Sequence, residues 1–321
     1  MRYRPGVPTP PPARPLPASD SATDPSARSP VALDEHAITA VIAWFADAGR
    51  DLPWRHPEAS AWSILVSEVM LQQTPVVRVL PRWLDWMDRW PAPADLAVAP
   101  TAEVLRAWDR LGYPRRALRL QECARAIVAQ HGGEVPRGED ALRALPGIGE
   151  YTAAAVTAFA HHGRAVVLDT NVRRVLARTV DGAALPPRSL TAAERRTAAR
   201  VLPAEPARSV AWNQAVMELG ALVCTAASPR CEECPLAGPA CTWYTAGRPP
   251  APEGSRRVQA FEGTDRQLRG QIMALLREND TAKEQELLAL DAEDPVRVRR
   301  CAASLVADGL AAADGTGLRL P

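Results

Sequence analysis

The sequence predicts a mainly helical protein. Apolar residues recur at the spacing of amphipathic helices through most of the chain between residues 34 and 223. Turns such as Trp90-Pro91 and Gly132-Gly133 separate these segments. No stretch before the C-terminal part alternates apolar and polar residues as a half-buried strand does. The expected helices lie at residues 34–48, 61–74, 78–89, 101–110, 114–131, 138–144, 150–161, 171–180, 191–202 and 209–223.

The N-terminal residues 1–32 are rich in proline and lack the apolar stretch of a signal peptide. This composition predicts a disordered leader. No apolar run in the chain is long enough to span a membrane. We therefore expect a cytoplasmic protein, whose 6 cysteines are reduced thiols or metal ligands rather than disulfides.

Length and charge leave room for a nucleic-acid partner without requiring one. A chain of 321 residues can form two domains, and its formal net charge is only +1. Arginines nevertheless gather at residues 104–125 and 164–200, whereas acidic residues gather at 278–294. The near-neutral total is therefore compatible with a basic face on the helical part and an acidic tail, or simply with solvated helix surfaces.

A glycine-containing turn joins two of the expected helices in the stretch LPGIGEYTAAAV (145–156). Glycine accepts positive φ and lets another backbone approach closely, so Gly147 and Gly149 indicate a tight hairpin. The helix after the turn begins with unpaired N–H groups and the positive end of its dipole, which is a ready anion site. An ordinary helix connection would carry the same pattern, and the turn alone does not decide between the two.

Four cysteines lie close together near residue 230 and form the pattern C-x6-C-x2-C-x6-C. Soft thiolates at such short spacings suit a tetrahedral metal ion or an iron–sulfur cluster. The spacing by itself does not distinguish zinc from iron–sulfur. The expected ligands are Cys224, Cys231, Cys234 and Cys241.

The C-terminal part is expected to form a separate small unit. Residues 247–262 contain the linker-like stretch GRPPAPEGS, and residues 263–321 follow it. Helical spacing is expected at 266–278, 283–290 and 294–308, followed by a weak hairpin around Asp314-Gly315. Three short helices and a hairpin suggest a winged-helix-like module.

Several motifs occur together in a consistent order. The turn LPGIGEYT, the stretch VLDTNV, the stretch WNQAVMELGALVC and the cysteines resemble the helix-hairpin-helix DNA glycosylase superfamily. Within it, LPWR (52–55) and SEVMLQQT (67–74) resemble the MutY family of adenine DNA glycosylases. The resemblance runs from about Leu33 to Tyr244. It implies a two-part, all-helical core over residues 33–246, with a [4Fe–4S] cluster on the four cysteines.

The resemblance assigns the two carboxylates that glycosidic bond cleavage needs. Glu68 lies on a helix among apolar neighbours, where desolvation would raise its pKa and let it act as a general acid. Asp169 precedes a helix and would stabilise the cationic sugar together with Asn171. From the pattern alone, Glu68 could also be a solvent-facing residue, and Asp169 a helix N-cap.

Tyr151 occupies the position where relatives such as endonuclease III place a lysine nucleophile. A tyrosine cannot form a Schiff base, and Lys283, the single lysine of the chain, lies beyond the expected linker. The sequence therefore predicts a monofunctional hydrolase. We expect the Tyr151 hydroxyl to order the catalytic water or Asp169.

The resemblance further implies double-stranded DNA as substrate, containing A:G or A:8-oxoguanine mispairs, and a monomeric enzyme that flips the target base out of the stack. The turn from Gly147 to Gly149 would clamp a phosphate through its N–H groups. The residues expected to wedge into the stack are Gln73 and Tyr113, and those expected to line the adenine pocket are Trp54, Arg55 and Gln214.

Three features depart from the family pattern. The last cysteine spacing is one residue longer than usual, and Thr170 stands where most relatives have glycine. The roughly 75 residues after Tyr244 are too few for the C-terminal domain with which many relatives read 8-oxoguanine. A mismatch-specific thymine glycosylase and a non-catalytic iron–sulfur DNA-binding or redox module remain alternative interpretations.

Overall fold

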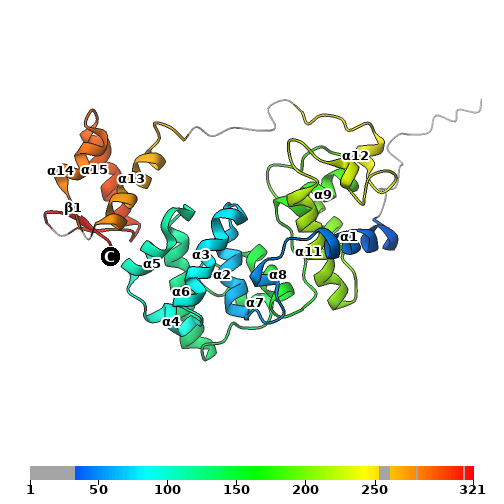
Figure 1. Cartoon of the computed structure of the whole chain (residues 1–321), viewed down its shortest axis with the longest axis horizontal. Helices are drawn as coiled ribbons and strands as arrows, with labels where there is room; N and C mark the ends of the chain where they lie inside the picture. The colour runs from blue at the N-terminus through cyan, green and yellow to red at the C-terminus, as the bar shows by residue number, and fades with distance from the viewer. Residues whose placement is uncertain (1–32, 253–260, 280, 314) are drawn as a thin grey trace, which may run out of the picture. The chain divides into compact units, whose positions relative to one another are not determined.

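The computed structural model describes residues 33–252, 261–279, 281–313 and 315–321. The expected leader and the central part of the expected linker lie outside these described residues. Within the described residues, helices dominate and no strand precedes Thr281 (Figure 1). A search of the same residues finds no helix that could cross a membrane.

The helices of the core follow one another closely in the chain, and the expected helical segments are confirmed within a few residues at each end. They are α1 (Glu35–Ala48), η2 (Pro53–Arg55), α2 (Ala61–Leu71), α3 (Val76–Arg89), α4 (Pro93–Val98), α5 (Thr101–Trp108), η3 (Asp109–Leu111), α6 (Arg115–His131), α7 (Glu139–Arg143), α8 (Glu150–Phe159), α9 (Thr170–Thr179), α10 (Ala192–Val201), α11 (Pro206–Leu222), η4 (Cys231–Glu233) and α12 (Thr242–Thr245).

Two helices end earlier than the apolar pattern indicated. The helix α2 stops at Leu71 because Gln73 adopts φ 55°, and α5 stops at Trp108 because Asp109 adopts φ 45°. A left-handed residue cannot continue a right-handed helix. The short helix α4 was not expected from the sequence.

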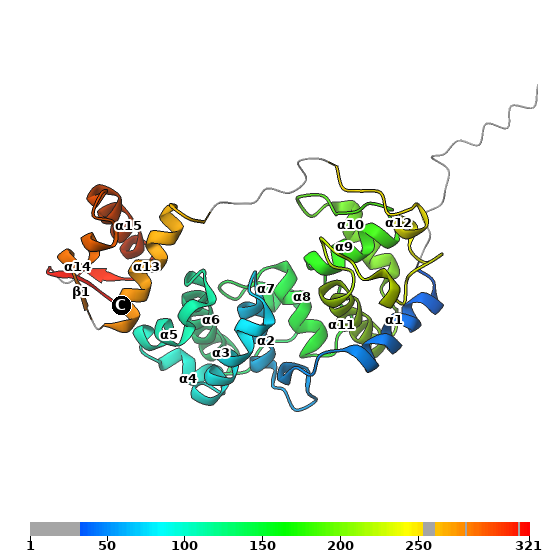
Figure 2. The same ribbon diagram turned by 45° about the horizontal axis from the view of Figure 1, so that its top comes forward.

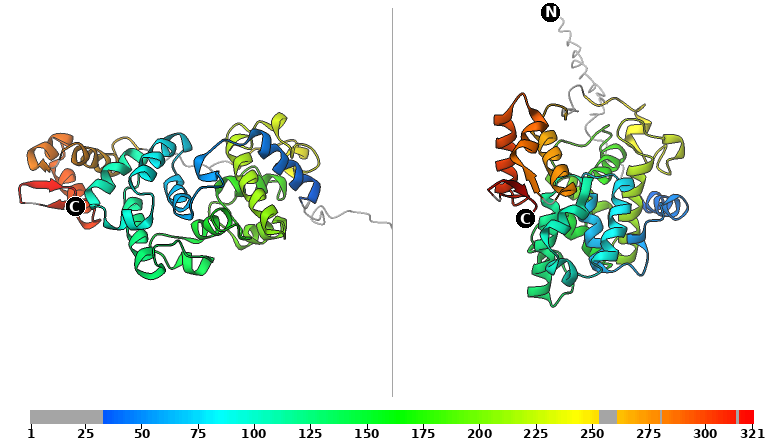
Figure 3. Two further views of the ribbon diagram at one scale, coloured as in Figure 1. Left: turned by 60° about the horizontal axis from the view of Figure 1, so that its bottom comes forward. Right: turned by 60° about the vertical axis from the view of Figure 1, so that its left-hand side comes forward.

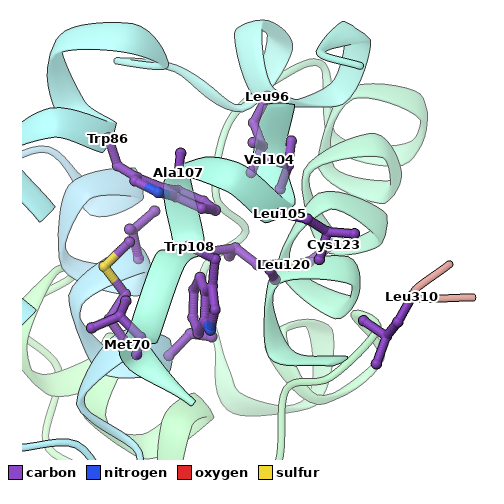
Figure 4. Close-up of a cluster of buried hydrophobic side chains, with 14 of the residues drawn as sticks. Met70, Trp86, Leu96, Val104, Leu105, Ala107, Trp108, Leu120, Cys123 and Leu310 are labelled. Carbon is purple, nitrogen blue, oxygen red and sulfur yellow. The ribbon is translucent and has the colours of Figure 1, made fainter. Parts of the chain in front are cut away.

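One hydrophobic core is built from α2 through α8. The indoles of Trp86 and Trp108 are fully buried in it, with ring centres 5.5 Å apart in an edge-to-face arrangement. Met70 of α2 and Leu105 of α5 pack into the same cluster (Figure 4). This core holds α2 and α8 against each other.

A second core joins the N-terminal helix to a later part of the chain. Helix α1 packs on α11, and α11 packs on α9 (Figures 2 and 3). The crossing of α9 and α11 is close, because a Cβ at Gly220 would lie 2.7 Å from the Cβ of Asn171. Glycine at position 220 therefore lets the start of α9 lie directly against α11.

The C-terminal residues form three helices and a small sheet. They are α13 (Asp265–Glu278), β1 (Thr281–Lys283), α14 (Glu284–Leu288), η5 (Ala289–Asp291), α15 (Pro295–Ala307), β2 (Ala312–Ala313) and β3 (Gly317–Arg319). The sheet is antiparallel in the order β1-β3-β2, with Ala282 opposite Leu318. The three-residue strand β1 was missed, because so short a segment has no readable period. The order of elements agrees with a winged-helix-like module, whose domain boundaries stay a prediction.

The turn between α7 and α8 differs in one respect from the expectation. Gly147 has φ 77°, and a Cβ there would lie 2.8 Å from the Cβ of Arg119. Gly149 instead has φ −93° as the N-cap of α8, and a Cβ added there would meet no other atom within 4 Å. Only Gly147 is therefore required by backbone conformation and packing.

Serine substitutions at Gly147 and Gly149 should change the free energy of unfolding in different ways. We expect Gly147→Ser to lower the free energy of unfolding by about 1–3 kcal/mol, because it adds left-handed strain and a clash. Gly149→Ser should leave it unchanged or raise it, since serine is a favourable N-cap. Urea unfolding of both variants measures the difference, and equal losses would contradict this description of the turn.

Candidate active site

A cleft of about 640 Å³ collects residues from both hydrophobic cores. Glu68 comes from α2 and Tyr151 from α8, whereas Asp169 and Asn171 come from the start of α9. Because these helices belong to different cores, the site exists only when the two cores are assembled. The sequence-predicted residues that line the cleft are Trp54, Arg55, Glu68, Gln73, Tyr151, Asp169, Asn171 and Gln214.

Glu68 is a buried carboxylic acid, with 5% of its surface exposed. Its pKa is raised from 4.5 to about 7, mainly by burial and in part by the nearby charge of Asp169. A hydrogen bond from Tyr151 and the charge of Arg55 act in the opposite direction. A carboxyl with this pKa is substantially protonated near neutral pH and can donate a proton.

The Tyr151 hydroxyl donates a hydrogen bond to Oε2 of Glu68 over 2.9 Å. The sequence-based expectation had linked this hydroxyl to a water or to Asp169, so its side-chain partner is a different carboxylate. Burial and the neighbouring charges of Glu68 and Asp169 raise the pKa of Tyr151 well above its usual value. The hydroxyl therefore stays protonated and acts as a fixed donor.

Asp169 is the N-cap of α9, as its sequence position allowed. Its Oδ1 accepts from the Val172 N–H at 2.7 Å, and its Oδ2 accepts from the Asn171 amide at 2.8 Å. Burial raises the pKa of Asp169 above its ordinary value of 3.8, and these two hydrogen bonds limit the rise. The Asn171 amide is itself held, because its Oδ1 accepts from Arg174 at 2.8 Å.

The residues expected to contact the base differ in how they are placed. Trp54 lines the cleft but is buried, and its ring packs edge-on against Trp83 at 5.4 Å. Gln214 lines the cleft from α11. The guanidinium of Arg55 donates to Glu218 at 2.8 Å and is 17% exposed.

Glu218 is a site residue that the sequence interpretation missed. Its carboxylate is 1% exposed and accepts from Arg50 Nε at 2.7 Å and from Arg55 Nη2 at 2.8 Å. Burial alone would raise its pKa, but the hydrogen bonds from both arginines hold the pKa at about 2. Its sequence signal was the spacing of four from Gln214, which places both side chains on one face of α11.

Four of the sequence-predicted residues lie in turns and not beside the carboxyls of Glu68 and Asp169. They are Gln73, Tyr113, Gly147 and Gly149. Gln73 is exposed at the edge of the cleft, whereas Tyr113 does not line it and is 43% exposed. Guanidinium groups of Arg266 and Arg116 lie 4.5 and 5.7 Å from the Tyr113 ring centre. Gly147 lines a separate hollow beside α6, and neither Gly147 nor Gly149 lines the cleft.

The four cysteines line one small cavity beside α9 and α11, and they are not paired as disulfides. Arg178 stacks on the Trp243 ring at 4.6 Å and donates to Sγ of Cys224 at 3.2 Å. Among the described residues, no group of three or more His, Cys, Asp or Glu side chains is arranged to hold a single metal ion.

The fold and the site define a class of protein. Residues 66–197 match the HhH-GPD superfamily of base excision DNA repair proteins. A thermostable thymine-DNA glycosylase is similar in structure, with a TM-score of 0.57 and 28% identity over 65% of this chain and 95% of that one. The fold is also that of an endonuclease III trapped on DNA, with a TM-score of 0.56 and 24% identity over 66% of this chain and 95% of that one.

Comparison with relatives identifies the family within this superfamily. An adenine DNA glycosylase of Mycolicibacterium smegmatis is 50% identical over 271 residues, covering 84% of this chain and 90% of the relative. That of Mycobacterium tuberculosis is 49% identical over 275 residues, covering 85% and 89%. The human adenine DNA glycosylase is 42% identical over 204 residues, covering 61% and 37%. The chain belongs to the adenine DNA glycosylase family, which confirms the resemblance found in the motifs.

The pairing of Glu218 with two arginines has a measurable effect on stability. We expect Glu218→Gln to lower the free energy of unfolding at pH 7 by about 3 kcal/mol, because two arginines lose a buried partner. The native pKa of about 2 lies below the ordinary value of 4.5. The contribution is therefore complete above pH 4.5 and is lost as the pH falls toward 2.

Urea unfolding of the wild type and the variant between pH 7 and pH 3.5 tests this dependence. Glu233→Gln is the matched control, since its pair with Arg230 is exposed and should contribute less than about 1 kcal/mol. A loss for Glu218→Gln that stays constant below pH 4.5 would rule out the proposed linkage.

Proposed function

We propose that the protein hydrolytically releases adenine from double-stranded DNA in which adenine is mispaired with guanine or 8-oxoguanine. The observation that carries the proposal is Glu68, a carboxyl with a pKa of about 7 that shares one cleft with Asp169. Family membership supports adenine as the base and repair as the context. The enzyme would act as a monomer on the DNA of the cytoplasm.

The residues divide the reaction into two tasks. The target adenosine is flipped out of the duplex, which costs a few kcal/mol, and enters the cleft. Glu68 donates its proton to a ring nitrogen of adenine as the bond from N9 to the sugar C1′ breaks. The ionised Asp169 stabilises the positive charge that develops on the sugar. Water then adds to C1′ and gives its proton to the Glu68 carboxylate, which leaves free adenine, an abasic site and the restored acid.

Tyr151 and Asn171 would tune these two carboxyls. The hydrogen bond from Tyr151 favours the charged form of Glu68 and so limits the rise of its pKa. Glu68 therefore stays acidic enough to release its proton. The Asn171 amide and the Val172 N–H favour the ionised form of Asp169. The same cleft therefore holds one carboxyl whose pKa is raised to about 7 and one whose hydrogen bonds oppose the rise that burial causes.

A monofunctional reaction follows from the absence of an amine among the described residues that line the cleft. Lys283 is the single lysine of the sequence, lies in β1 and does not line the cleft. Opening of the abasic sugar through a Schiff base requires a neutral amine. We therefore propose that the DNA backbone stays intact after the base is released.

A thymine-specific reaction is the second candidate. A thymine/uracil-DNA glycosylase of Pyrobaculum aerophilum is 35% identical over 208 residues, covering 64% of this chain and 90% of the relative. The adenine-specific relatives are nearer to this chain and align over more of it. Adenine is therefore the base that we propose.

We propose that Cys224, Cys231, Cys234 and Cys241 hold a [4Fe–4S] cluster. The four thiols line one cavity beside α9 and α11, and soft thiolates are the usual ligands of iron–sulfur clusters. Membership of the adenine DNA glycosylase family supports the cluster over zinc. The Arg178 guanidinium suits an anionic group at this place. The cluster would cross-link residues 224–241 and supply a centre capable of electron transfer.

Glu68→Gln tests the proposed general acid. We expect single-turnover release of adenine from an A:8-oxoguanine duplex to fall by about 10²–10⁴-fold, the usual contribution of a positioned proton donor. In the wild type the rate should fall as the pH rises through about 7, because Glu68 then loses its proton. Tyr151→Phe should move this fall to higher pH, since it removes a hydrogen bond that lowers the pKa of Glu68.

A T:G duplex and borohydride treatment of the reaction serve as controls. Adenine release without thymine release, and without a trapped covalent complex, supports the proposal. Near-normal turnover by Glu68→Gln, or trapping that Lys283→Ala abolishes, would overturn the assigned roles.

Iron analysis tests the proposed cluster. We expect about four iron atoms and four sulfides per chain, with visible absorption that disappears on oxidation or chelation. Cys231→Ser should lose iron and solubility, whereas Cys123→Ser, at a buried thiol in the first core, should retain its iron. If the active protein contained one zinc ion and no iron, the proposed cluster would be wrong and the four cysteines would form a zinc site.

A further inference from the structure

The guanidinium of Arg116, on α6, donates six hydrogen bonds. Its two terminal nitrogens share them equally, and its guanidinium lies 5.0 Å from the ring centre of Trp108. Nη1 donates to the carbonyls of Val69, Met70 and Gln72 at 2.9, 3.1 and 2.7 Å, and Nη2 donates to Thr74 Oγ1 and the carbonyls of Leu111 and Gly112 at 3.0, 3.2 and 3.0 Å.

These acceptors belong to two separate turns. One is the end of α2 with the turn that carries Gln73, and the other is the turn between α5 and α6 that carries Tyr113. Thr74 also links them, because its hydroxyl donates to the Leu111 carbonyl at 3.1 Å. The carbonyls at the end of α2 carry partial negative charge, which suits a guanidinium. Arg116 thus joins two turns that are distant in sequence.

Both turns contain a residue in an unfavourable backbone conformation. Gln73 has φ 55° and Tyr113 has φ 47°, in the left-handed region that non-glycine residues seldom occupy. Such residues cost about 1–3 kcal/mol each and persist where the surroundings hold them. Arg116 binds the carbonyl directly before each one, that of Gln72 and that of Gly112. It therefore fixes the two peptide planes that lead into the strained residues.

We propose that Arg116 is a positioning residue that holds Gln73 and Tyr113 as one preformed wedge for opening the duplex. This inference rests on the proposed function, in which these two residues enter the base stack. The planar guanidinium reaches both turns at once, and a lysine ammonium at the same place lacks that fork. Burial lowers the pKa of Arg116 to about 10, so the group remains charged at neutral pH.

A purely structural role and a positioning role differ in their dependence on base pairing. If Arg116 only stabilises the fold, its loss reduces activity on every substrate alike. If it holds the wedge, its loss is felt when adenine is paired and stacked, and not when adenine is already extrahelical. The discriminating quantity is therefore the ratio of release rates for a paired and an unpaired adenine.

The experiment compares Arg116→Lys with the wild type on two duplexes under single-turnover conditions. One contains adenine opposite 8-oxoguanine, and the other contains the same adenine as a single-nucleotide bulge. We expect a loss of at least tenfold on the paired substrate and of less than threefold on the bulge. Arg125→Lys is the matched control on the same helix, since Arg125 is exposed and, within the part of the chain that the structure describes, donates to the Ala97 carbonyl alone. It should change neither rate.

A fluorescence measurement gives a readout without chemistry. With 2-aminopurine in place of adenine opposite 8-oxoguanine, Glu68→Gln protein should raise the emission as the base leaves the stack. The double variant Glu68→Gln/Arg116→Lys should raise it less, while binding an abasic-site duplex equally well. Equal losses on the paired and bulged substrates, or undiminished emission, would overturn the proposal.

One further variant keeps the test decisive. If Arg116→Lys does not fold, Thr74→Val replaces it, because it removes one Arg116 acceptor and the link to Leu111 while retaining the charge. Its loss should likewise be confined to the paired substrate, and a uniform loss would count against the proposal. Failure of the proposed function itself has a different signature, namely wild-type protein that releases adenine from neither duplex.

Discussion

The buried carboxyl of Glu68 is the constraint around which the site is arranged. It lies where α2 of the first core faces the residues that α9 and α11 contribute from the second core. An ionised carboxylate in such a place is costly, so its pKa moves to about 7. Among the described residues, the hydrogen bond that its carboxyl accepts comes from Tyr151, on a helix of the first core. Burial between the two cores therefore raises the pKa of Glu68, and Tyr151 and the charges in the cleft modulate it.

Arginines bonded to main-chain carbonyls and buried carboxylates fix the irregular segments around the cleft. Arg116 joins the turns of Gln73 and Tyr113, and Arg174 connects the Asn171 amide to the Gly220 carbonyl. Arg55 is held by Glu218. Each guanidinium satisfies several acceptors from different segments at once, which an ammonium could not do in the same geometry. Arginines thus supply these tertiary cross-links in a chain with one lysine, and the described residues that line the cleft include no amine.

The separation of tasks between the cleft and the cysteine cavity also follows from the fold. The cysteines lie in the segment after α11, and α9 lines the cleft with its first residues and the cysteine cavity with its last ones. Arg174 connects the two regions, because its guanidinium donates hydrogen bonds to the Cys224 carbonyl and to Oδ1 of Asn171. Order in the cysteine segment therefore supports the position of Asn171, and through it the Asp169 carboxylate.

The sequence by itself determined the helical class, the cores' apolar positions and the chemistry-bearing motifs, because these depend on local periodicity and on residue types at short spacing. The resemblance of its motifs to a known family assigned Glu68 and Asp169 as the two carboxyls, and the short spacing of the four cysteines predicted a metal or cluster site. Only the tertiary structure decided that Tyr151 bonds Glu68, that Glu218 pairs with Arg50 and Arg55, and that Gln73 and Tyr113 are strained. Each of these depends on groups tens of residues apart whose side chains meet only after the helices pack. Burial, and with it the pKa of Glu68, is likewise a property of the assembled cores, which no local pattern contains.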